Sequence, residues 1–218
     1  MKTTANQFRY IGTKIAAALL TIYNSYSQNV NIPDANFKAV LLAYQEINTN
    51  FDKEIQVSEA AAFKGNMDVF NKGISDLTGI EAFVKIKKLY CYGNSLTSLD
   101  VSKNTALTTI SCYNNKLTSL DVSKNTALAY LYCRSNALTS LDVSKNTALI
   151  KLNCSENTLT NLNVANGNNK KITSFVTIKN PNLTCIQVDN VDYSTAKWTI
   201  KGGNINANAT FNLKCGSK

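Results

Sequence analysis

The chain has 218 residues and lacks histidine, has only two prolines and contains no apolar run of the roughly 20 residues that cross a bilayer. Without histidine it has neither the most common general base nor the usual partner of a nucleophilic serine or cysteine. A glycine-rich phosphate-binding loop and the serine turn of the α/β-hydrolases are also missing. Its carboxylates lie mostly at repeated positions or in the terminal segments, and nothing singles out a glycosidase-type pair. We therefore expect that the chain is not an enzyme.

The longest apolar run, residues 15–23 (IAAALLTIY), is too short for a transmembrane helix. It follows Lys2, Arg9 and Lys14 and leads into the small residues Ser25 and Ser27. A basic start, a short apolar centre and small residues just before a cleavage point are typical of a secretory signal peptide. We predict that residues 1–27 are removed on export. This removal takes away three basic and no acidic residues and lowers the net charge from +9 to +6.

An internal repeat of 21 residues dominates the rest of the chain. The segment 96–107 (LTSLDVSKNTAL) returns unchanged at 117–128 and 138–149, and decayed copies begin at Leu159 and Leu183. Between the copies runs the pattern L-x-x-L-x-C-x-x-N-x-L, which resembles the leucine-rich-repeat signature. The lysines are spread about one per repeat, which favours a solubilising surface over a nucleic-acid groove, so we expect no nucleic-acid partner.

One copy of the pattern, residues 128–138, shows how each repeat is expected to fold. Leu128, Leu131 and Cys133 are expected to point inward, and Tyr130, Tyr132 and Arg134 outward. We therefore predict one strand per repeat in a parallel sheet. The return segment of about eleven residues is too short for a helix with two turns, and its apolar residues alternate. We therefore predict a leucine-rich-repeat solenoid with extended or 3-10 return segments. Asparagines at the strand ends are expected to satisfy backbone groups of the turns: Asn94, Asn115, Asn136, Asn157 and Asn180.

An open solenoid needs caps, and we predict a small helical cap at residues 28–73. Asp34 is suited to begin a helix, and the apolar residues after it recur at helical spacing. Residues 48–59 resemble an EF-hand loop, but asparagine stands at position 1 and Lys53 replaces the glycine at position 6. We interpret this loop as a vestigial site kept as a cap and predict no cofactor. The candidate calcium ligands are Asn48, Asn50, Asp52, Glu54 and Glu59.

The six cysteines divide into two groups. Four of them share one inward position 21 residues apart, and such a ladder does not converge on a point as zinc ligands must: Cys91, Cys112, Cys133 and Cys154. We expect these four to be buried free thiols. Cys185 and Cys215 lie outside that column, and in an exported protein we expect them to form a disulfide. That bond would close a β-rich C-terminal cap at 183–218, with Trp198 as a lid, after repeats of 21–24 residues at 74–182.

The stretch 74–91 and the repeats after it resemble the repeats of internalin-type bacterial surface proteins. Together with the helical cap, the whole mature chain is similar to secreted repeat proteins of Bacteroidetes-type bacteria. The resemblance implies a secreted or cell-surface bacterial protein that serves as an adhesin or partner-binding module. We expect it to be a monomer.

The return segments are copied without change, whereas the outward strand positions differ in every repeat. These positions are rich in tyrosine and carry an arginine, the side chains that anchor binding surfaces. We therefore predict a site for a protein or a glycan on the sheet. Its candidate residues are Lys88, Tyr90, Tyr92, Ser111, Tyr113, Tyr130, Tyr132, Arg134, Lys151 and Asn153. The alternatives are a structural stalk of a larger surface assembly, or a binder of ice or a polymer through the repeated Ser, Asp and Lys columns.

Overall fold

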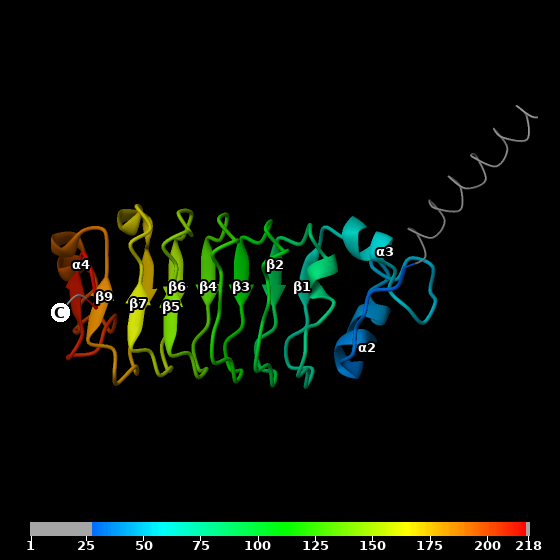
Figure 1. Ribbon diagram of the computed structural model, residues 1–218, viewed down its shortest axis with the longest axis horizontal. Coiled ribbons are helices and arrows are strands. Elements are labelled where there is room, and N and C mark those ends of the chain that lie inside the picture. The colour runs from blue at the N-terminus through cyan, green and yellow to red at the C-terminus, as the bar shows by residue number, and fades with distance from the viewer. Residues whose placement is uncertain (1–27, 217–218) are drawn as a thin grey trace, which may run out of the picture.

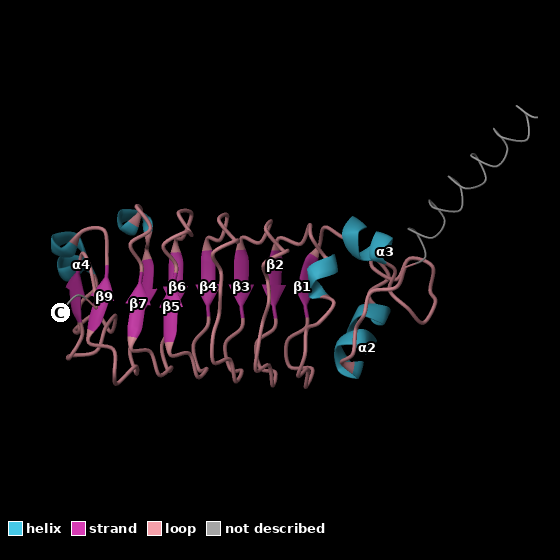
Figure 2. Cartoon of the chain, viewed as in Figure 1, coloured by secondary structure: helices cyan, strands magenta, loops and turns pink. Residues whose placement is uncertain are grey.

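The computed structural model describes residues 28–216, and the predicted signal peptide lies outside them. The described chain forms an elongated solenoid whose coils stack along the long axis, with helices at both ends (Figure 1). Strands line the coils, and loops connect them at the edges (Figure 2). The predicted solenoid of parallel strands is confirmed.

A six-stranded parallel sheet runs along one side of the solenoid in the order β1-β2-β3-β4-β6-β8. Each strand is three residues long, and equivalent positions of successive repeats pair with each other, for example Tyr90 with Ser111 and Ser111 with Tyr132. The first strand, β1, comes from the segment that we assigned to the N-terminal cap. The strands are β1 (Asn66–Asp68), β2 (Lys88–Tyr90), β3 (Thr109–Ser111), β4 (Tyr130–Tyr132), β6 (Lys151–Asn153) and β8 (Ser174–Val176).

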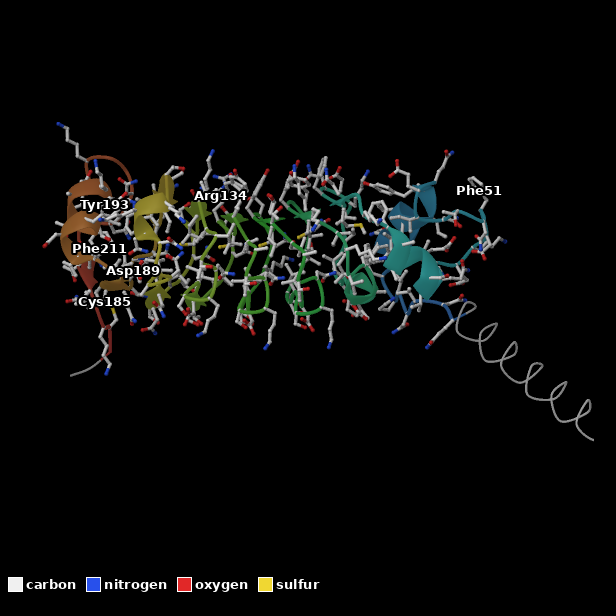
Figure 3. All side chains as sticks on the ribbon, turned by 90° about the horizontal axis from the view of Figure 1, so that it is seen from above. Phe51, Arg134, Cys185, Asp189, Tyr193 and Phe211 are labelled. Carbon is white, nitrogen blue, oxygen red and sulfur yellow. A yellow bond between two sulfur atoms is a disulfide. The ribbon has the colours of Figure 1, made fainter. Side chains whose placement is uncertain are left out.

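The return segments form a second parallel sheet in the order β10-β9-β7-β5. Its strands are β5 (Ser140–Asp142), β7 (Asn161–Asn163), β9 (Cys185–Gln187) and β10 (Thr210–Asn212). Arg134, which follows β4, and Cys185 of β9 lie on opposite long sides of the molecule (Figure 3). The two sheets therefore enclose the core between them, as the predicted extended return segments require.

The core consists of one repeated set of leucines, valines and cysteines. In the coil of β4, Leu128, Leu131 and Cys133 are fully buried, as the alternation predicted. All four cysteines of the column are buried and unbonded, which confirms the predicted thiols. Because one coil cannot cover its own inner face, the stacking of neighbouring coils supplies this burial.

Asparagine side chains join each coil to the next. The predicted column at the strand ends behaves as expected: Asn157 Nδ2 donates to the carbonyls of Cys133 and Cys154, and Asn157 Oδ1 accepts from the Leu138 N–H. A second column, which the sequence analysis did not identify, lies on the return side. There Asn125 Nδ2 donates to the carbonyls of Val101 and Asn104. Its members are Asn104, Asn125 and Asn146, all completely buried.

The N-terminal cap contains α2 (Ala35–Ala43), α3 (Val57–Ala62) and, in the first coil, the 3-10 turn η1 (Ile80–Ala82). Asp34 begins α2 as predicted, because its Oδ1 accepts from the Phe37 N–H at 2.9 Å. Its Oδ2 accepts from the N–H and Oγ of Ser75 at 2.8 Å each. One carboxylate therefore both caps the helix and ties it to the first coil.

The C-terminal cap follows the 3-10 turn η2 (Asn169–Lys171) and β8 and includes α4 (Val191–Lys197). Trp198 is buried, and its ring stacks on Phe175 at 4.1 Å between centroids. Tyr193 and Phe211, at the same end of the molecule (Figure 3), also contact the Trp198 ring. Cys185 and Cys215 are joined in the predicted disulfide.

Candidate functional site

The outward side of the six-stranded sheet, called the sheet face below, carries a hollow of about 500 Å³ over its first strands. Seven of the ten predicted binding residues line it: Tyr90, Tyr92, Ser111, Tyr113, Tyr132, Arg134 and Asn153. The other three, Lys88, Tyr130 and Lys151, lie on the same face, paired in one row with Thr109 between Lys88 and Tyr130. The sheet thus brings together residues that are up to 65 positions apart in the chain, from Lys88 to Asn153.

Two residues of the hollow escaped the sequence analysis, namely Asp68 and Phe70. Both belong to or follow β1, a strand that lacks the leucine pattern of the repeats. The available signal was the spacing: Phe70 precedes Tyr92 by 22 residues, close to the 21 residues that separate Tyr92 from Tyr113. The hollow therefore begins one coil earlier than the predicted set of residues.

Three aromatic rings form a continuous stack along one edge of the hollow. Phe70 and Tyr92 stack with their centroids 4.7 Å apart, and Tyr92 and Tyr113 do so at 4.5 Å, both nearly parallel at 6°. The Arg134 guanidinium lies 5.3 Å from the centre of the Tyr113 ring, so it covers the end of the stack. Cation–π attraction favours this arrangement and holds the cation at the edge of the hollow.

The middle strand β3 supplies a low floor between two tall neighbours. Ser111 points outward yet is only 4% exposed, and Thr109 beside it is only 6% exposed. Small side chains in an outward row lose contact with water when larger side chains on both sides cover them. Tyr90 and Tyr132 occupy the paired positions on β2 and β4 and form these walls.

Two tyrosines of the hollow, Tyr92 and Tyr132, have raised pKa values. Partial desolvation, followed by the neighbouring Tyr113, raises the pKa of Tyr92 above its usual value. Partial burial, with smaller effects of Tyr130 and Tyr90, raises the pKa of Tyr132. The tyrosine hydroxyls can therefore donate hydrogen bonds to a ligand at physiological pH.

A second depression, of about 720 Å³, adjoins the hollow and shares Asp68 with it. Helix α2 forms its other wall, with Tyr44 donating a hydrogen bond from its hydroxyl to the Asp68 carbonyl at 3.0 Å. Lys72 also lines this depression. The sheet face is thus continuous with the helical cap, which the sequence analysis did not foresee.

The repeated Asp column has a structural explanation. Oδ1 of Asp100 accepts from the Ser102 N–H and Oδ1 of Asp121 from the Ser123 N–H, both at 2.8 Å. These backbone hydrogen bonds lower the pKa of both aspartates. The carboxylates therefore form the turns of the return segments, which accounts for their repetition without an ordered ligand.

The EF-hand-like loop is held by hydrogen bonds within the protein. Glu59 Oε1 accepts from the N–H and Oγ1 of Thr49, and Glu59 Oε2 accepts from the Gln56 N–H at 3.0 Å. Glu54 pairs with Lys38 at 2.7 Å. Of the other candidate ligands, Asn48 is buried, and Asn50 and Asp52 bond to each other. The carboxylates of Glu54 and Glu59 are therefore engaged in contacts within the cap.

Within residues 28–216, no group of three or more His, Cys, Asp or Glu side chains is placed to hold a metal ion. In the same range no helix has the length and apolar character needed to cross a membrane.

No protein-family model matches the chain. Over 87 residues it is 38% identical to internalin J of Listeria monocytogenes, a match that covers 39% of this chain and 9% of internalin J. The solved functional domain of internalin J, described as including a cysteine ladder, superimposes with a TM-score of 0.58 and 36% identity, covering 74% of this chain and 38% of that one. A solved internalin F from the same species has a TM-score of 0.52 at 18% identity, covering 75% of this chain and 54% of that one, and is similar in fold alone. The chain thus spans well under two thirds of these relatives, and it has the internalin-like leucine-rich-repeat fold with internalin J as a sequence and structural neighbour.

Proposed function

We propose that the protein is a secreted or cell-surface bacterial binding module that engages a protein or a glycan through its sheet face. The observation that carries the proposal is the hollow, where seven varied outward residues of the repeats meet. A cluster of Tyr and Arg side chains in a depression is the composition of binding hot spots. The proposed role is not catalytic and requires no metal or cofactor.

The contrast between the two sides of each repeat supports the proposal. The return segments are identical at 96–107, 117–128 and 138–149, and their aspartates form turns. The set of outward strand residues changes from repeat to repeat although the strands pair in the same register. The turns thus account for the repeated aspartates, whereas no such role accounts for the varied outward residues.

The similarity to internalin J also supports a binding role, because internalin-like leucine-rich-repeat proteins are surface binding modules. Export follows from the predicted signal peptide at residues 1–27. A disulfide between Cys185 and Cys215 suits an oxidising compartment.

The experiment is a screen of the purified protein against a glycan array and a phage-displayed random peptide library. We expect Tyr90→Ala combined with Tyr132→Ala to weaken any selected ligand at least about tenfold, the usual loss at a hot spot. The matched control combines Asp121→Ala with Lys124→Ala on the repeated side and is expected to retain binding. If the control loses binding and the tyrosine variant keeps it, the repeated side is the binding surface and the proposal is wrong.

A further inference from the structure

Two of the three rings in the aromatic stack, Tyr92 and Tyr113, have both faces covered, so they offer a ligand only their edges. Tyr92 lies between Phe70 and Tyr113, each nearly parallel to it at 4.7 and 4.5 Å. The second face of Tyr113 is occupied by the Arg134 guanidinium. Since the rings are stacked along the solenoid axis, their edges and hydroxyl groups are what the stack can present outward.

This geometry favours an acceptor-rich ligand over a sugar ring. A pyranose packs on an aromatic residue by laying its C–H bonds against an open ring face, and Tyr92 has none. The edge of an aromatic ring carries the positive part of its quadrupole, so it attracts carboxylate and carbonyl oxygens. The Tyr92 hydroxyl, whose pKa is raised, is a hydrogen-bond donor for the same oxygens.

The floor of the hollow has room for a single side chain. Tyr90 and Tyr132 lie on strands two apart, and two strand spacings amount to about 10 Å. Ser111 between them is a short residue, flanked by these two walls, and the hollow extends down to it. A partner can place one apolar side chain over Ser111, as anchor residues of protein interfaces do in a pocket.

The charges around the hollow are mainly positive and are not neutralised by the protein. Lys88, Arg134 and Lys151 lie on the sheet face, and among the described residues none of them forms an ion pair. The nearby Glu156 carboxylate is committed to Lys179 at 2.7 Å and to Ser135. Among residues 28–216, Asp68, at the edge on β1, is the only acidic one that lines the hollow.

Resting on the proposed function, we infer that the partner is an acidic protein segment. One apolar side chain of that segment seats over Ser111 between Tyr90 and Tyr132. Its carboxylates face Arg134 and the two lysines of the sheet face. A positive rim steers and orients a partner of opposite charge.

The test uses a phage-displayed library of random 12-residue peptides, panned on the immobilised protein at 50 mM NaCl. We expect the enriched peptides to carry a net negative charge and a shared apolar position. Synthetic copies should bind at least about tenfold more weakly to Arg134→Glu, and 500 mM NaCl should weaken binding several-fold, because screening acts on exposed charges. Lys124→Glu, which makes the same charge change on the repeated side, is the control.

The variant Ser111→Tyr tests the floor by filling the space between the two walls. It should abolish binding of the selected peptides, whereas Ser174→Tyr, an exposed outward position on β8 outside the hollow, should not. Circular dichroism and melting temperature establish that both variants fold. Should Ser111→Tyr fail to fold, Tyr90→Ala carries the same comparison.

Four outcomes overturn the inference. Enrichment of neutral or basic peptides at the hollow contradicts the acidic partner, and so does equal binding by Arg134→Glu. Glycan-array binding that Tyr90→Ala abolishes, with no peptide enriched, excludes the acidic segment but leaves the proposed function standing. If neither screen gives a ligand sensitive to the sheet-face variants, the inference and the proposed function both fail.

Discussion

At the scale of single residues, the buried asparagines decide how neighbouring coils hold together. Asn125 has no exposed surface, and its Nδ2 bonds the Val101 and Asn104 carbonyls at 3.1 and 3.0 Å. Each carbonyl belongs to the preceding coil, where water cannot replace the bond. Such an amide therefore acts as a crosslink between coils as well as a turn residue.

We predict that Asn125→Ala lowers the free energy of unfolding by about 2–4 kcal/mol, because two buried carbonyls lose their donor and a small cavity forms. Urea denaturation followed by circular dichroism measures this change. The neighbouring exposed variant Lys124→Ala should change stability by less than about 0.5 kcal/mol. Equal effects of the two changes would show that the second asparagine column is dispensable.

The cysteine column makes stability depend on pH. Burial raises the pKa of Cys112 and Cys154 to about 12, from an ordinary value of 9.0, and raises those of Cys91 and Cys133 well above it. Above pH 9 the unfolded chain therefore releases thiol protons that the folded chain retains. Stability from the buried thiols is complete below pH 9 and falls as the pH rises from 9 toward 12.

We predict that each thiol contributes about 1.4 kcal/mol of lost stability at pH 10, one unit above the ordinary pKa. The comparison is between the native protein and Cys112→Ala, each denatured with urea at pH 8 and at pH 10. The variant should be less stable at pH 8 but should lose less on going to pH 10. An identical loss in both proteins would mean that Cys112 ionises while folded.

At the scale of elements, the caps close the two ends of the core in different ways. The N-terminal cap uses helix α2 and the Asp34 carboxylate, whose hydrogen bonds to Ser75 and Phe37 outweigh its desolvation and lower its pKa. The C-terminal cap uses a ring cluster around Trp198 and the Cys185–Cys215 disulfide. Since the disulfide joins residues 30 positions apart, it constrains the whole segment that contains α4 and β10.

We predict that Cys185→Ala combined with Cys215→Ala lowers the stability of this cap by about 3–4 kcal/mol, the loop entropy of such a crosslink. Trp198 is the only tryptophan of the chain, so its fluorescence reports on the cap alone. Its emission should shift to the red at lower urea concentration in the variant than in the native protein. Coincident transitions would show that the ring cluster holds the cap without the disulfide.

The elements also show which features of the fold follow from local sequence. The parallel strands, the cysteine column and the helix start at Asp34 were predicted because alternation and capping are local signals. The second sheet was predicted only as extended chain: 99–101, 120–122 and 141–143 are identical, yet only the last copy contributes to a strand, β5. The segment 140–142 forms a strand because it pairs with β7. The presence of such a partner cannot be read from the segment itself.

The candidate site was predictable to the same extent. Seven of the residues that line the hollow were predicted from the repeat, because a 21-residue repeat places equivalent positions of neighbouring strands side by side. Asp68 and Phe70 were missed, because β1 pairs like a repeat without its leucines. The stack of Phe70, Tyr92 and Tyr113 depends on side-chain rotation, which the spacing of residues does not determine.

At the scale of the whole molecule, the solenoid behaves as a stack of nearly interchangeable coils, whereas the hollow belongs to particular coils. Residues 117–137 and residues 138–158 each make up one repeat of 21 residues, and each begins with the sequence LTSLDVSKNTAL. Deleting either repeat rejoins the chain at a leucine in an equivalent position. Stacking between the remaining coils is preserved in both deletions.

We predict that both deletion variants fold, with a lower free energy of unfolding because one set of coil contacts is lost. Deleting 117–137 removes Tyr132 and Arg134, so β6 would pair with β3 and place Asn153 beside Ser111. Deleting 138–158 keeps the Tyr90, Ser111 and Tyr132 arrangement and, of the candidate residues, removes Lys151 and Asn153. Peptides or glycans selected on the native protein should therefore lose binding to the first variant and retain most of it with the second. Circular dichroism and a cooperative melting transition establish folding, and equal retention by both variants would place the binding surface outside the hollow.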